Sequence, residues 1–329
     1  MNRSSRIDFL RSIAILSVIV SHTYEIAFFA FGVQLFFFVS GYLLITALES
    51  MTFKGFILYR AVRLFPLAIF MTIIFSSRFD SQLELVTNLL LFAAFIPQFT
   101  WFPGGWSINY EWIFSFVILI LFKFNSISTK KIFITLLVLA SLISEKIISD
   151  SITGSNNSKV NITYLGFLVN IIFLFLGVAV RQEIIKLKIK YFYFLIPGIF
   201  ILAIYYPFPN TFYTIWFFSI LLLIILVFNF NISIFLNSFI IIEIISFLGK
   251  RTYGLFCGHF IVMILIQKIG PGKVLLVDYL NNYLYDFFAK TIYFILTLFL
   301  SIIFAYFCYK YIESPQIKLV RKFLAYKKW

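Results

Sequence analysis

The sequence contains a series of apolar runs long enough to cross a lipid bilayer, and this feature constrains the fold more than any other. A helix needs about 20 apolar residues, or about 17 at the short end, to span the hydrocarbon layer. Hydrophobic residues make up 62% of the 329 residues and charged residues only 12%, with a mean hydropathy of +1.01. A soluble fold needs a polar surface and could not bury so much apolar surface. The sequence therefore predicts an all-α, polytopic integral membrane helical bundle.

Ten of the apolar runs are good candidates for membrane-spanning helices, and two more are ambiguous. The ambiguous stretches are residues 85–98 and 232–247, so hydropathy alone allows either ten or twelve spans. The ten good candidates are residues 9–29, 33–50, 64–77, 107–122, 132–149, 162–180, 191–206, 211–230, 252–269 and 288–309.

Positive charge decides between these alternatives, because the cytoplasmic loops of membrane proteins are enriched in Lys and Arg. If neither ambiguous stretch crosses, the positive residues sort to one side, whereas a crossing at 85–98 would place the "KFNSISTKK" loop outside. Only six of the 27 Lys and Arg residues then lie outside: Arg78, Lys146, Lys159, Lys268, Lys273 and Lys290. We therefore expect ten transmembrane helices with both termini cytoplasmic, and two non-crossing segments that are re-entrant or lie on the surface.

Residues 1–329 are expected to form a single membrane domain in the inner (plasma) membrane, without an appended soluble domain. The net charge of +14 follows from the positive-inside pattern and is not taken as a sign of nucleic-acid binding. Cys257 and Cys308 lie in apolar runs without CxxC spacing, so they are interpreted as packing residues and no metal site is expected.

The first apolar run carries an arginine and a histidine, residues that a lipid-buried helix should avoid. Arg11 and His22 are separated by about 1100° of helix, or three turns plus about 20°, and by about 16 Å along the axis. They therefore share one helix face and define a polar stripe that leads from the cytosol into the membrane. Arg11 is either a snorkelling anchor or a functional group, and His22 is either an interhelical hydrogen-bonding residue or a proton-transfer group. Glu25 stays unassigned.

Three further polar features lie in or beside apolar runs. Arg60 and Arg63, in "YRAVRLFP", are spaced i, i+3 on one helix face before the third span, where they suit either phosphate binding or contact with lipid headgroups. Glu111, in "FPGGWSINYEWIF", is expected about one turn into a helix, where a carboxylate needs a partner or a water-filled cavity. His259, the second histidine, also falls within a predicted span and has no assigned role.

Six of these segments, in order along the chain, together resemble the membrane-bound acyltransferase-3 family, an O-acetyltransferase-like group. A single match would be weak, but the six run in order from residue 6 to residue 315 and so cover nearly the whole chain. The matching segments are "RIDFLRSIAILSVIVSH", "GVQLFFFVSGYLL", "YRAVRLFP", "WSINYEWIF", "LGKRTYGLFCGHF" and "YIESP".

This resemblance implies transfer of an acyl group, usually acetyl, from cytosolic acyl-CoA to a hydroxyl of a sugar, a lipid or another acceptor. It implies catalytic-site positions for His22, Arg11 and Glu111 and an acyl-CoA-binding pair in Arg60 and Arg63, with Arg11 joining that pair in holding the CoA phosphates. His22 would be the general base or a transient acyl carrier, and the chemistry needs no metal. No tightly bound cofactor is expected, because acetyl-CoA is a donor substrate. The expected partners are acyl-CoA, a glycan or glycolipid acceptor and the lipid bilayer.

The chain departs from the family pattern at three positions. Gln34 stands where an acidic or small residue is common, Trp112 replaces a second acid, and Ser12 stands where glycine is frequent. These departures bear on substrate preference more than on reaction type. The leading hypothesis is an O-acetyltransferase that modifies a cell-envelope or exported polysaccharide. Transfer of another acyl group, a lipid or small-molecule acceptor, and a transporter or exporter that uses His22 and Arg11 remain alternatives.

Overall fold

The computed structural model is helical throughout the residues that it describes, and no strand occurs among them. These residues are 3–93, 96, 102–123, 159–181, 239–269 and 283–326. Contacts divide the chain into two compact units, which we describe separately. The first unit comprises Met1–Val33 and Leu236–Pro315, and the second comprises Gln34–Phe235 and Gln316–Trp329.

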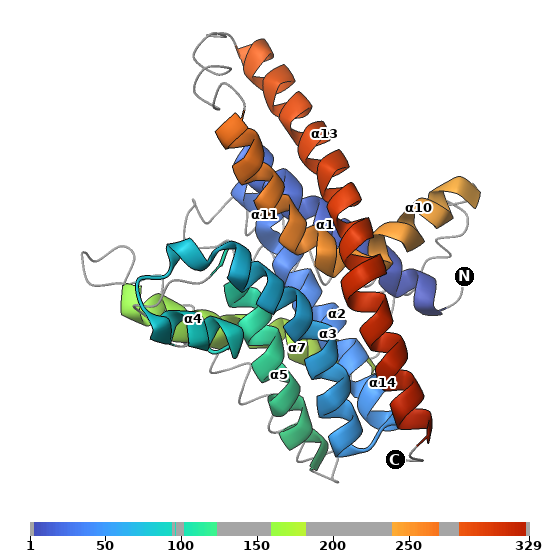
Figure 1. Ribbon diagram of the computed structural model, residues 1–329. Coiled ribbons are helices and arrows are strands. Elements are labelled where there is room, and N and C mark those ends of the chain that lie inside the picture. Colours follow the sequence, from blue (N-terminus) through green and yellow to red (C-terminus); the bar gives the residue numbers. More distant parts are fainter. Residues whose placement is uncertain are drawn as a thin grey trace, which may run out of the picture. The chain divides into compact units, whose positions relative to one another are not determined.

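The first unit is built on α1, against which three later helices pack (Figure 1). Its elements are α1 (Arg3–Tyr24), η1 (Ala27–Ala30), α10 (Phe239–Lys250), α11 (Thr252–Ile269) and α13 (Tyr283–Cys308). A Cβ on Gly249 of α10 would collide with the backbone of Asp8 in α1, so only glycine permits this close approach. Ser12 joins the same two helices, because its Oγ donates a hydrogen bond to the carbonyl of Ile245 at 2.9 Å. Small residues therefore position α1 in its unit.

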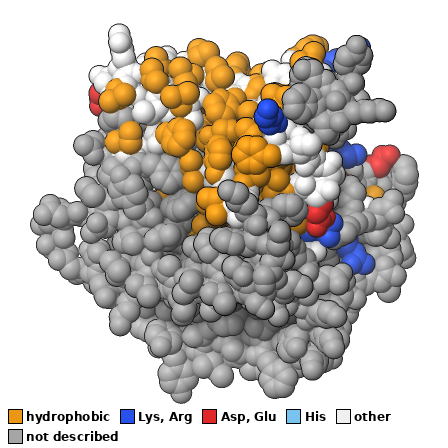
Figure 2. All heavy atoms as spheres, turned by 90° about the horizontal axis from the view of Figure 1, so that it is seen from below, with side chains coloured by type: hydrophobic (Ala, Val, Ile, Leu, Met, Phe, Trp, Pro, Cys, Tyr) orange, Lys and Arg blue, Asp and Glu red, His pale blue; other side chains and the backbone are white. Residues whose placement is uncertain are grey.

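The helix that begins with α13 continues through a π-helical turn, η6 (Tyr309–Glu313), into α14 (Ser314–Tyr326). Pro315 explains the widened turn, because proline has no N–H and its ring would clash with the carbonyl of Tyr311 in a regular α-helix. Many large apolar side chains of α13 are exposed, among them Phe299 at 59%. Figure 2 likewise shows hydrophobic side chains gathered on the described part of one face. Such a surface suits lipid rather than water.

The second unit brings together α2 with α3, α5 and α7. Its described elements are α2 (Phe31–Ser50, from Gln34 onward), α3 (Phe53–Ile74), η2 (Ser76–Arg78), α4 (Gln82–Leu89), α5 (Gly105–Lys123) and α7 (Lys159–Arg181). A Cβ on Gly41 of α2 would collide with the carbonyl of Leu174, and one on Gly177 of α7 with the carbonyl of Phe38. Glycines on both helices therefore allow α2 and α7 to approach closely, as small residues do in membrane bundles.

Four described helices are long and apolar enough to cross a membrane: Ser5–Tyr24, Phe31–Ser50, Phe53–Ile74 and Phe287–Val320. These confirm a helical membrane protein, whereas the count of ten spans and the side of the termini stay predictions. The predicted spans 132–149, 191–206 and 211–230 lie outside the described residues.

The two ambiguous stretches contain short helices. In 85–98, α4 has 8 residues and ends at Leu89, so it is about 12 Å long. In 232–247, α10 has 12 residues and is about 18 Å long. Both fall short of the roughly 30 Å hydrocarbon layer. Their lengths fit segments that do not cross, although part of each stretch lies outside the described residues.

One helix extends beyond its predicted span, and one boundary prediction is wrong. The third predicted span begins at residue 64, whereas the helix that contains most of it, α3, begins at Phe53 and includes both Arg60 and Arg63. Hydropathy falls at the two arginines, but arginine is a good helix former, and Thr52 caps the N-terminus by accepting the Gly55 N–H. Glu111 was expected one turn into its helix, but α5 begins at Gly105, which places Glu111 nearly two turns in.

Candidate active site

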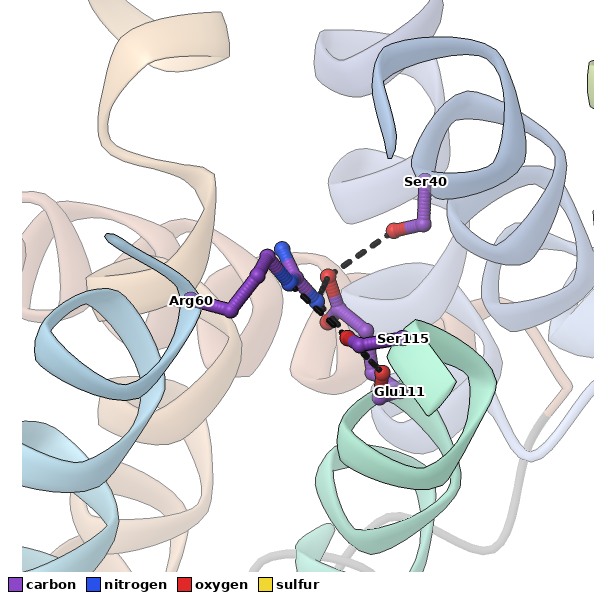
Figure 3. A network of polar contacts seen from close by, with 4 residues as sticks. All are labelled: Ser40, Arg60, Glu111 and Ser115. Carbon is purple, nitrogen blue, oxygen red and sulfur yellow. Dashed lines mark hydrogen bonds and ion pairs between the residues drawn. The ribbon is translucent and has the colours of Figure 1, made fainter. Parts of the chain in front are cut away.

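In the second unit, Arg60 and Glu111 form an ion pair between α3 and α5 (Figure 3). Arg60 Nη2 lies 3.0 Å from Glu111 Oε1, and Arg60 Nε donates to Ser115 Oγ at 3.0 Å. Ser40, on α2, donates its hydroxyl to the same Glu111 Oε1 at 2.9 Å. One carboxylate oxygen thus receives hydrogen bonds from two other helices, and the four residues form a network that joins α2, α3 and α5.

This network explains how two charged side chains are accommodated within apolar helices. The Arg60 and Glu111 side chains are only 4% and 21% exposed, so neither charge has the full hydration that it would have in water. An uncompensated buried charge costs several kcal/mol, and charge-assisted hydrogen bonds offset this cost only when the geometry is good. The sequence predicted that Glu111 would need a partner or a water-filled cavity, and the structure supplies Arg60 as the partner.

Arg60 and Arg63, which were expected to act together on phosphates, have different surroundings. The Arg60 guanidinium is directed at Glu111 and Ser115, whereas Arg63, one turn further along α3, is half-buried and adds a second positive charge near the Glu111 carboxylate. Sequence reasoning also missed two members of the network. Ser40 precedes Gly41 in "GVQLFFFVSGYLL". Ser115 follows Glu111 at i+4, and this spacing places Ser115 and Glu111 on the same helix face.

In the first unit, Arg11 and His22 lie on α1, which is continuous from Arg3 to Tyr24. The helical phase used to place them on one face therefore holds along the whole interval. Arg11 is half-buried, and Arg11 and Lys250 both interact electrostatically with the buried carboxyl group of Asp8. The His22 side chain is exposed and lies in the last turn of α1.

The second histidine lies beside the first. The ring centroids of His22 and His259 are 5.4 Å apart, and the ring of Phe260 lies 5.0 Å from that of His22. His259 is fully buried, and its Nδ1 lies 3.3 Å from the carbonyl oxygen of Leu255. Sequence reasoning placed both histidines in apolar runs but did not predict their contact.

The three residues that depart from the family pattern each make a contact between helices. Ser12 bridges α1 and α10, as described above. Gln34 is buried and donates its amide N–H to Asn170 Oδ1 of α7 at 3.1 Å. Trp112 is buried and packs edge-on against Phe65 at 5.0 Å, so an aromatic contact between α3 and α5 takes the place of a second acid.

Cys257 and Cys308 are free, buried thiols. Among the described residues, no group of three or more His, Cys, Asp or Glu side chains is placed to hold a metal ion.

Long apolar helices and a buried ion pair between α3 and α5 define this chain as a helical membrane protein. Residues 4–315 match the acyltransferase domain family, acyltransferase family 3. The chain belongs to this family, which makes it an acyltransferase. No curated protein and no solved structure matches the chain.

Proposed function

We propose that the protein is an integral membrane O-acyltransferase that transfers an acetyl or similar acyl group from cytosolic acyl-CoA to a hydroxyl of a cell-envelope or exported polysaccharide. Family membership supports acyl transfer, and the exposed imidazole of His22 supports the placing of the chemistry on α1. Imidazole is the side chain whose ordinary pKa best suits proton transfer near neutrality. The plasma membrane as location and a glycan or glycolipid acceptor belong to the same proposal.

The proposed reaction needs one base and one hydrogen-bond donor that stabilises developing negative charge. His22 removes the proton of the acceptor hydroxyl while the hydroxyl oxygen attacks the thioester carbonyl carbon. The resulting tetrahedral oxyanion needs a hydrogen-bond donor close to His22. Arg11 lies about 16 Å from His22 along α1, so we assign it to the phosphates of acyl-CoA and not to the oxyanion. Collapse of this intermediate breaks the carbon–sulfur bond, and the imidazolium of His22 returns the proton to the departing CoA sulfur. The products are the ester and free CoA, and His22 is neutral again.

The polar network of the second unit leads us to assign different roles to Arg60 and Arg63. Because the Arg60 guanidinium is held by Glu111 and Ser115, we propose that Arg60 and Glu111 are positioning residues that hold α3 against α5. Arg63 is then the member of the Arg60 and Arg63 pair that we assign to the phosphates of acyl-CoA, since guanidinium groups match phosphate oxygens well. Acyl-CoA is a substrate in this scheme, and no resident cofactor takes part.

The test uses purified protein in liposomes with acetyl-CoA and extracted envelope glycan. Free CoA is measured with a thiol reagent, and acetylation of the glycan by mass spectrometry. His22→Ala protein should release no CoA above background, while Ser21→Ala, a neighbouring change on the same helix, should behave like the parent. A His22→Ala protein that acetylates at the parental rate would falsify the assignment. Movement of a labelled substrate across the liposome membrane without any thiol release would support a transporter instead.

A further inference from the structure

The buried imidazole of His259 has no role in the reaction described so far. The chain has only two histidines, and both belong to the first unit, where their rings lie 5.4 Å apart with planes tilted by 30°. This separation falls within the range of contacting aromatic rings, about 4.5–7 Å. One ring is exposed and the other is completely buried behind it.

Hydrogen bonding assigns the tautomer of the buried ring. His259 Nδ1 lies 3.3 Å from the carbonyl oxygen of Leu255, and a carbonyl can only accept, so Nδ1 carries the proton. In a neutral imidazole the other nitrogen, Nε2, is then an acceptor with a free lone pair. His259 Nε2 is buried and has no hydrogen-bond partner in the described part of the chain. A buried acceptor without a donor is costly, so a donor that arrives during the reaction would be bound well.

The surroundings of His22 show why such an acceptor is useful. A base that takes a proton becomes a cation, which a low-dielectric site destabilises unless a nearby group accepts a hydrogen bond from its other ring nitrogen. No ion pair to His22 is present among the described residues. Phe260 contacts both imidazoles, at 5.0 Å from His22 and 4.0 Å from His259. The aromatic contact restricts how the His22 ring can turn, and the buried ring stands next to it.

We propose that His259 is a positioning residue for His22, with its Nε2 accepting the N–H of the His22 imidazolium. The N–H that neutral His22 already carries makes this hydrogen bond, which strengthens when the other ring nitrogen takes the proton of the acceptor hydroxyl and weakens when that nitrogen returns the proton to the CoA sulfur. It orients the His22 ring so that its other nitrogen faces the substrate. A neutral imidazole performs this task without placing a permanent negative charge in the helix bundle. The inference rests on the proposed function of His22.

Two substitutions of His259 separate its acceptor from its bulk. His259→Gln keeps an oxygen that can accept a hydrogen bond, whereas His259→Phe keeps a packed ring and removes the acceptor. We expect His259→Phe to lower kcat by about 10²-fold, the lower end of what proton-transfer groups contribute, with KM for acetyl-CoA unchanged. His259→Gln should recover most of that loss. Cys257→Ala, a buried change on the same helix, serves as the control with parental kcat.

A second measurement is independent of activity and uses the two-histidine composition of the chain. Protein labelled with ¹⁵N-histidine and purified on a histidine-free tag gives NMR signals from two imidazoles only. We expect a cross-peak between the two rings, an Nδ1-protonated His259, and a change in the His22 ring-nitrogen shifts in the His259→Gln protein.

A parental kcat in the His259→Phe protein overturns the inference. His22 ring-nitrogen chemical shifts that are the same in the parent and in the His259→Gln protein overturn it as well. Either result leaves the acyltransferase proposal intact if His22→Ala is inactive. An active His22→Ala protein refutes the assignment of His22 as base, whatever the NMR signals show. If His259→Phe fails to fold, activity of His259→Gln and its spectrum still decide the question.

Discussion

Removal of the Glu111 carboxylate should destabilise the protein strongly, because it leaves Arg60 as a buried cation without its partner. The Arg60 side chain is 4% exposed, so water cannot replace the lost carboxylate without a rearrangement of α3 and α5. Loss of one member of a buried ion pair costs about 3–5 kcal/mol. We expect Glu111→Leu to fall in this range and Glu111→Gln to cost less, about 1–3 kcal/mol, because its amide oxygen still accepts hydrogen bonds.

The reciprocal change should cost less. Arg60→Met leaves the Glu111 carboxylate with the Ser40 hydroxyl as a donor, and the Glu111 side chain is 21% exposed and so partly hydrated. The double variant Arg60→Met with Glu111→Leu removes both charges together. Apolar replacements of whole buried ion pairs are often neutral or stabilising by about 1–4 kcal/mol. The double variant should therefore be more stable than Glu111→Leu alone.

The assay is unfolding of the purified protein in mixed micelles with increasing SDS content, followed by tryptophan fluorescence. A double-mutant cycle over the parent, the two single variants and the double variant gives the coupling free energy. We expect at least about 2 kcal/mol of favourable coupling between Arg60 and Glu111. Additive single effects, to within about 0.5 kcal/mol, would refute the argument that the pair compensates buried charge.

Three further changes test other contacts. Ser40→Ala removes the hydroxyl donor to the carboxylate and should cost about 1.5–3 kcal/mol in the same unfolding assay, whereas Ser50→Ala, an exposed serine on α2, should cost under about 0.5 kcal/mol. Gly177→Ala places a methyl group against the backbone of α2 and should lower stability by about 1–3 kcal/mol; an unchanged unfolding curve would contradict the close approach of α2 and α7. Arg63→Gln should raise KM for acetyl-CoA about tenfold or more with stability preserved, and an unchanged KM would remove Arg63 from the donor site.

Local periodicity was sufficient to predict some features of this molecule. The shared face of Arg11 and His22 follows from one continuous helix, because 3.6 residues per turn relates positions within a helix without any knowledge of its neighbours. The start of α3 was not predicted, since hydropathy measures preference for lipid and not the extent of a helix. Thr52, which caps that helix, was the local signal that could have corrected the boundary.

Whether a contact between helices can be predicted depends on how many possible partners the sequence offers. Glu111 needed a cation, but Arg11, Arg60 and Arg63 all lie in or near apolar runs, and helical spacing does not choose among them. The choice of Arg60 depends on the packing of α3 against α5, which is a long-range property.

The histidines are a simpler case, because the chain has only two and both lie in helices of its first unit. A polar side chain within a membrane helix is stabilised by another polar group, so the contact between the two could have been predicted from the sequence, although it was not. No pattern in the sequence predicts that the two histidines differ in burial. One ring ends exposed on the last turn of α1, and the other is buried on α11 with its Nδ1 hydrogen-bonded to the preceding turn. This difference in burial is why His22 is assigned to the substrate and His259 to the support of His22.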